Sequence, residues 1–171
     1  MDIWAFLVFF GACGAAAASG ALFPTGDWYK SLNKPKWTPP DWIFPIAWTI
    51  FYFALAFAGA RVSSLPDNQF AVAFWSLHIA LNTLWTPVFF GSRNLRAGMI
   101  IIVLMWFSTA GLIFHCFSVD SLSGLVLSPL HYLGDYCDCP ELLVITKKQA
   151  IVNSFKVSIW LCGVPAMLAW V

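Results

Sequence analysis

The chain is divided into apolar runs long enough to cross a lipid bilayer, separated by more polar connections. The runs cover about residues 3–23, 42–62, 69–90 and 95–117. A helix needs roughly 20 apolar residues to span the hydrocarbon core. Only 10% of the 171 residues are charged, too few to cover a surface that faces water. We therefore predict an all-α fold, an integral membrane bundle of helices.

The C-terminal quarter of the chain departs from this pattern. Residues 130–149 are polar and irregular, whereas residues 150–171 are apolar enough for a fifth span. Asn153 and Lys156 weaken the first half of that span. We therefore predict a bundle over residues 1–129, an atypical polar insertion over 130–149, and an atypical, truncated fifth transmembrane helix over 150–171.

The first apolar run raises two questions. Its small residues at 16–20 resemble a signal-peptide cleavage site, but the run is long and Asp2 stands where a basic residue is usual. These features favour a retained span.

Gly11, Ala15 and Ser19 recur every four residues, a pattern that lets helices approach closely in lipid. Packing inside the bundle or a homodimer face would explain it, and we favour internal packing.

The segment 34–48 combines prolines and tryptophans at the entrance of the second run. Proline fixes φ and restrains the preceding residue, so Pro39 and Pro40 hold an extended segment rather than a helix. Tryptophan suits a membrane boundary or an aromatic-lined cavity. We interpret this segment as a lid over a ligand site. Its tryptophans are Trp37, Trp42 and Trp48.

Polar and aromatic side chains share one face of the third run. Trp75, His78, Asn82, Trp85 and Phe89 are three or four residues apart, which places them on the same side of a helix. An amide inside a membrane helix needs a partner or a cavity. Asn82 is therefore expected to point inward, to another helix or to a ligand.

The second run carries a complementary face with Trp48, Tyr52, Leu55 and Gly59. If the two faces meet, they enclose an aromatic cavity beneath the proline-rich segment. Flat aromatic ligands would stack there, with Asn82 or Tyr52 setting their orientation.

Several functions are disfavoured by what the sequence lacks. A net charge of +1 gives no attraction to nucleic acid. No second ligand stands at metal-binding spacing from His78, and the spacing of His131, Cys137 and Cys139 is weak for zinc. No nucleophile–base pair is recognisable. We therefore expect no metal, no required cofactor, no catalytic residue and no enzyme activity of the acid–base kind.

Two long motifs resemble the translocator protein family, also called the TspO family or peripheral benzodiazepine receptor family. One includes Trp37-Thr-Pro-Pro-Asp-Trp42 and continues to Tyr52. The other is Leu81-Asn-Thr-Leu-Trp-Thr-Pro-Val-Phe-Phe-Gly91. The resemblance covers roughly residues 1–129. It implies a five-helix membrane bundle, often dimeric, that binds porphyrins such as protoporphyrin IX or haem and, in some members, cholesterol or benzodiazepine-type ligands.

The resemblance also implies a set of pocket residues beneath the first loop. Some bacterial members promote light-dependent porphyrin breakdown, in which tryptophans are implicated, and the matching positions here are Trp48 and Trp170. Tyr52 and His78 are added from the helical faces described above. The candidate ligand-binding residues are Trp37, Trp42, Phe44, Trp48, Tyr52, His78, Asn82, Trp85 and Trp170.

Three functions remain open: a porphyrin-binding translocator, a light-dependent porphyrin-degrading activity, and a membrane scaffold or stress-response interaction protein. The resemblance places eukaryotic members in the mitochondrial outer membrane or secretory membranes and bacterial members in the cell envelope. The family's fifth helix matches up to Pro129 and resumes near Ala166. We hypothesise that about residues 130–165 are an insertion, either genuine or an unspliced segment.

Overall fold

The computed structural model describes residues 2–23, 42–129 and 131, and they are helical apart from short connections. No strand occurs among these residues. The predicted all-α membrane fold is confirmed. The helices are α1 (Ile3–Leu22), α3 (Ile43–Val62), α4 (Gln69–Thr86), the π-helical turn η1 (Pro87–Gly91) and α5 (Leu95–Val119), followed by helical residues 121–129.

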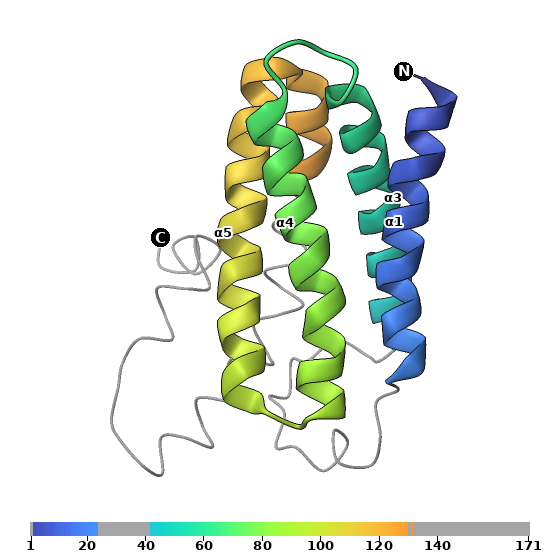
Figure 1. The fold of residues 1–171 in the computed structure, drawn as a ribbon, viewed down its shortest axis with the longest axis vertical. Helices are drawn as coiled ribbons and strands as arrows, with labels where there is room; N and C mark the ends of the chain where they lie inside the picture. The colour runs from blue at the N-terminus through green and yellow to red at the C-terminus, as the bar shows by residue number, and fades with distance from the viewer. Residues whose placement is uncertain (1, 24–41, 130, 132–171) are drawn as a thin grey trace, which may run out of the picture.

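The described helices run up and down in one bundle (Figure 1). α1 lies beside α3, and α4 lies beside α5. The connections at 63–68 and 92–94 are short, so each pair of helices that they join is antiparallel. Within the described part of the chain, three stretches are long and apolar enough to cross a membrane: Ile3–Leu22, Pro45–Val62 and Arg96–Val119.

Capping side chains and a proline explain several helix ends. Asp2 Oδ1 accepts from Trp4 N at 3.0 Å to begin α1, and Asn94 Oδ1 accepts from Ala97 N at 3.1 Å to begin α5. The third apolar run, expected as one helix over 69–90, instead changes from α-helix to π-helix at Pro87. Proline has no N–H to continue the α-helical ladder.

The core is centred on Trp75 of α4, which contacts two other helices. Its indole Nε1 donates to the Leu55 carbonyl of α3 at 2.9 Å. The ring of Phe9 from α1 packs edge-on against it, with centroids 4.6 Å apart. Phe9 also covers Gly59 of α3, where a Cβ atom would lie 2.5 Å from the phenyl ring. The missing side chain at Gly59 therefore allows α1 to approach α3.

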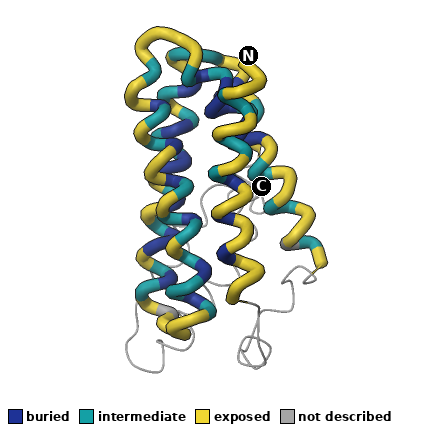
Figure 2. Tube along the Cα trace, turned by 45° about the vertical axis from the view of Figure 1, so that its right-hand side comes forward, coloured by how far each residue is buried: buried dark blue, intermediate teal, exposed yellow. Residues whose placement is uncertain are grey.

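The outward helix faces are exposed and apolar, as expected for surfaces against lipid (Figure 2). The small-residue stripe of α1 belongs mainly to this outer surface. Gly11 and Ala15 are exposed, and only Ser19 of that series is buried. Our preference for internal packing of this stripe was wrong, because the buried positions of α1 are Cys13, Ala16 and Ser19.

The chain turns into a further helical segment immediately after α5. α5 ends at Val119, two residues beyond the expected end of the fourth run, and residues 121–129 are again helical. Only Asp120 separates the two helices. The predicted insertion at 130–149, apart from His131, and the predicted fifth span at 150–171 lie outside the described residues.

Candidate ligand-binding site

A hydrogen bond joins the two helical faces that the sequence singled out. Tyr52 of α3 donates its hydroxyl to Asn82 Oδ1 of α4, with an O–O distance of 2.7 Å. Trp48 lies one turn before Tyr52, with ring centroids 5.7 Å apart, and makes an edge-on contact with Phe51 at 5.6 Å. The structure thus places the aromatic side chains of α3 beside the polar side chain of α4.

Asn82 uses only its amide oxygen in the contact with Tyr52. The residue is 5% exposed, and its Nδ2 atom has no partner among the described residues. Trp85, one turn further along α4, stacks on Phe89 with centroids 5.0 Å apart, and its buried Nε1 also has no partner there. Buried polar groups are normally hydrogen-bonded, so these two donors mark positions for ligand or water.

His78 lies one turn before Asn82 and is 2% exposed. Its Nδ1 atom is 2.9 Å from Thr109 Oγ1 and 3.4 Å from Ser108 Oγ, both on α5. Both hydroxyls also lie within hydrogen-bond distance of the Met105 carbonyl, at 2.9 Å and 2.8 Å respectively. His78 is therefore anchored through Nδ1 to the polar pair of α5, and its Nε2 has no hydrogen-bond partner among the described residues.

Sequence reasoning identified His78 but missed the residues that hold it. Ser108 and Thr109 are a polar pair in the middle of an otherwise apolar run, a signal that could have placed them inside the bundle. Phe51 was also missed, although its ring lies 5.4 Å from the His78 ring. Phe51 therefore connects the aromatic face of α3 to the imidazole of α4.

Of the remaining candidate residues, only Trp42 has a described side chain, and it is exposed. Trp42 precedes the first turn of α3 and is 66% exposed. Phe44 belongs to α3, but the position of its side chain is not described. Trp37 and Trp170 lie outside the described residues. Their roles in a pocket stay predictions.

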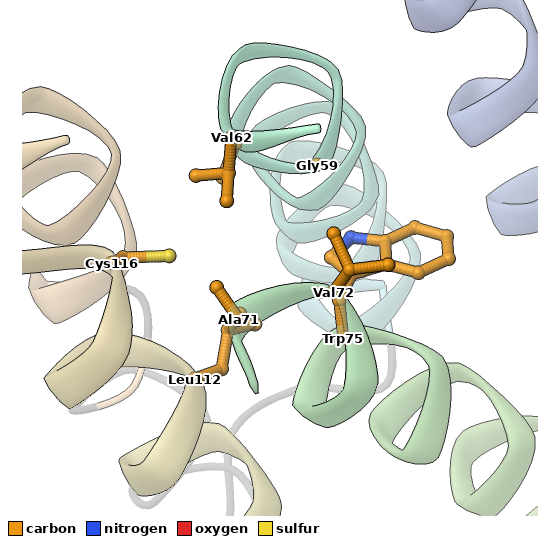
Figure 3. A pocket seen from close by; sticks show the side chains of 8 residues that line it. Gly59, Val62, Ala71, Val72, Trp75, Leu112 and Cys116 are labelled. Carbon is orange, nitrogen blue, oxygen red and sulfur yellow. The ribbon is translucent and has the colours of Figure 1, made fainter. Parts of the chain in front are cut away.

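A separate shallow niche, too small to hold a ligand, lies where α3, α4 and α5 meet (Figure 3). Its lining includes Gly59, Trp75, Leu112 and Cys116, and it presents only apolar surface. Ligand sites usually combine apolar walls with a few polar groups that fix orientation. The niche lacks these groups, so the cluster around Tyr52 and Asn82 is the better candidate site.

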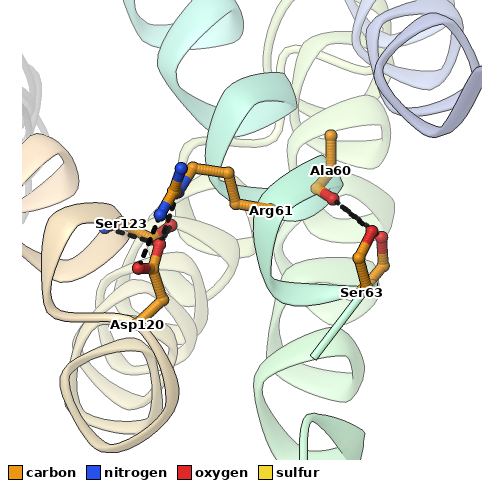
Figure 4. Close-up of polar contacts among 6 residues, drawn as sticks. Ala60, Arg61, Ser63, Asp120 and Ser123 are labelled. Carbon is orange, nitrogen blue, oxygen red and sulfur yellow. Dashed lines mark hydrogen bonds and ion pairs between the residues drawn. The ribbon is translucent and has the colours of Figure 1, made fainter. Parts of the chain in front are cut away.

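An ion pair joins α3 to the junction that follows α5 (Figure 4). Arg61 donates from Nε and Nη2 to the two carboxylate oxygens of Asp120, at 2.8 Å and 2.9 Å. Ser123 also donates to Asp120 through its backbone N–H and its hydroxyl. The bonds from Arg61, together with those from Ser123, hold the pKa of the Asp120 carboxyl well below its usual range.

The comparison with known proteins agrees with these features. The model of the TspO/MBR family matches residues 5–133. The chain belongs to the TspO/MBR family. It is 48% identical to the protein CrtK of Rhodobacter capsulatus over 133 residues, which are 75% of this chain and 83% of the relative.

Other members are similar over much of their length. The tryptophan-rich sensory protein of Cereibacter sphaeroides is 43% identical over 129 residues, 75% of this chain and 82% of the relative. The human translocator protein is 26% identical over 118 residues, 64% of this chain and 70% of the relative. The TspO/MBR match over residues 5–133 includes both motifs and all of the described helices except the first two residues of α1.

Proposed function

We propose that this TspO/MBR protein binds porphyrins within its helical bundle and serves as their membrane receptor or translocator. The observation that carries the proposal is the Tyr52–Asn82 hydrogen bond. It joins the aromatic face of α3, with Trp48, to the polar face of α4. Aromatic rings can stack on a flat macrocycle. The Nδ2 donor of Asn82 can fix the orientation of the bound macrocycle through a hydrogen bond. Cholesterol and benzodiazepine-type compounds are further candidate ligands by family resemblance.

Trp48→Phe is expected to weaken protoporphyrin IX binding about tenfold, because a smaller ring loses part of the stacking contact. Titration of the purified protein in detergent, followed by the porphyrin absorption band, measures this. Trp4→Phe is the matched control, because Trp4 is 73% exposed on the outer face of α1. Equal affinities for the two variants would contradict a role for Trp48, and absence of saturable binding to the native protein would refute the proposed function.

A light-dependent breakdown of bound porphyrin is the second candidate function. The observation that favours it is the contact between Trp48 and Tyr52, 5.7 Å between centroids, because both rings are oxidisable and lie in the candidate site. Illumination of the protoporphyrin complex in air should then bleach the porphyrin faster than free porphyrin in the same detergent. Trp48→Phe should slow this bleaching beyond its effect on occupancy. If illumination leaves the porphyrin absorption spectrum unchanged, the protein binds porphyrin but does not degrade it.

A further inference from the structure

The turn that follows α4 departs from α-helical geometry close to the candidate site. Pro87 has no N–H, and the chain widens into η1, in which the Ser92 N–H donates to the Pro87 carbonyl at 2.9 Å. Such π-helical turns are rare and occur frequently at functional sites. Because η1 begins two residues after Trp85, its geometry decides what packs against the Trp85 indole.

Phe89 of η1 occupies a hollow that a glycine of α5 leaves open. The Phe89 side chain is 1% exposed. A Cβ atom at Gly98 would lie 2.7 Å from Phe89 Cδ2, well inside the roughly 3.5–4.0 Å at which carbon atoms pack. Phe90 makes an edge-on contact with the same ring, with centroids 5.0 Å apart. The absence of a side chain at Gly98 therefore determines where the Phe89 ring lies.

The Trp85 indole takes its orientation from this ring. It stacks on Phe89 with centroids 5.0 Å apart and planes 15° apart, and Phe90 packs edge-on against it at 5.4 Å. The Nε1 atom of Trp85 is buried and has no partner among the described residues. A buried N–H is normally hydrogen-bonded, so an acceptor atom of a ligand would satisfy it. The direction of this donor is thus set from α5, through Gly98 and Phe89.

We propose that Gly98 and Phe89 are positioning residues that aim the Trp85 N–H at a hydrogen-bond acceptor of the ligand. The proposal rests on the proposed function, because Trp85 belongs to the same candidate site. It adds a chemical requirement: the ligand must present a carbonyl or carboxylate oxygen at the level of Trp85. The propionate groups of protoporphyrin IX are acceptors of this kind.

The test is a double-mutant cycle on protoporphyrin IX binding, measured by titration of the purified protein in detergent. Gly98→Ala should displace the Phe89 ring, tilt the indole and weaken binding about fivefold, the usual net value of one hydrogen bond. Trp85→Phe, which removes the N–H, should lose at least as much affinity. In the Trp85→Phe background, Gly98→Ala should have no further effect on affinity, because the donor that it misdirects is absent.

Gly111→Ala is the matched control for crowding. Gly111 is also on α5, and a Cβ atom there would lie 2.5 Å from the ring of Phe74, about three helical turns before Trp85. This variant should be destabilised to a similar extent but should bind protoporphyrin IX with native affinity. A second readout needs no ligand. Gly98→Ala should change the near-ultraviolet circular dichroism of the native protein, and should change that of Trp85→Phe much less.

The outcomes separate positioning from porphyrin binding itself. Equal losses of affinity in Gly98→Ala and Gly111→Ala, or losses that add in the double variant, would refute positioning by Gly98 while porphyrin binding stands. Native affinity in Trp85→Phe would refute the donor role. If the native protein does not bind protoporphyrin IX, the proposed function fails and the donor role fails with it, whereas circular dichroism still reports whether Gly98 orients Trp85. If Gly98→Ala does not fold, Phe89→Leu removes the stacked ring and should produce the same loss of affinity; native affinity in that variant overturns the proposal.

Discussion

Gly59→Ala is expected to destabilise the protein, although alanine normally stabilises a helix relative to glycine by up to about 1 kcal/mol. The added Cβ would lie 2.5 Å from the ring of Phe9. That ring cannot withdraw easily, because it packs on Trp75. Overpacking of this kind costs about 1–3 kcal/mol, which exceeds the gain from helix propensity. Thermal unfolding in detergent, followed by circular dichroism, measures the effect.

Gly20→Ala is the control for this prediction. Gly20 is in α1, and a Cβ atom there would meet nothing within 4 Å. This variant should therefore leave stability unchanged or raise it slightly. The double variant Gly59→Ala with Phe9→Leu should recover part of the loss, because the smaller side chain gives way. If both single glycine variants behave alike, the close approach of α1 and α3 at Gly59 is not present in solution.

The parts of the fold that could be predicted are those controlled by local properties of the sequence. The apolar runs predict the helices, because a backbone inside lipid must satisfy its own polar groups. The spacing of Asn82 and Tyr52 places each on an inward helical face. Whether the two side chains meet depends on how α3 and α4 pack, and the structure supplies their 2.7 Å contact.

Other features depend on contacts between distant segments and could not be predicted. The small-residue stripe of α1 looked suited to internal packing, yet Gly11 and Ala15 are exposed. The orientation of α1 is fixed instead by Phe9, which fits over Gly59. The hydrogen-bond partner of the His78 imidazole is Thr109, 31 positions later. Nothing in the local sequence around His78 specifies that partner.

Asp120→Asn is expected to destabilise the junction after α5 by removing the charge pair with Arg61. Asparagine retains an oxygen that can accept from the Ser123 backbone N–H, so the start of the following helix keeps its cap. Asp120→Ala removes both interactions and should cost about 1 kcal/mol more, the usual value of an N-cap. The difference between the two variants therefore separates the cap from the ion pair, as thermal unfolding in detergent can show.

The effect of Asp120→Asn should depend on pH in a defined direction. The folded-state pKa of the Asp120 carboxyl is depressed. Its contribution to the free energy of unfolding is therefore fully present above the unfolded-state pKa of about 3.9. That contribution is lost as pH falls further, toward the folded-state pKa. The stability difference between the native protein and Asp120→Asn should therefore be constant from about pH 5 to 8 and shrink below about pH 4. A difference that instead grows on acidification would show that the Arg61–Asp120 pair does not stabilise the fold. Asp2→Asn, which alters the cap of α1 without involving Arg61, controls for the loss of a carboxylate elsewhere.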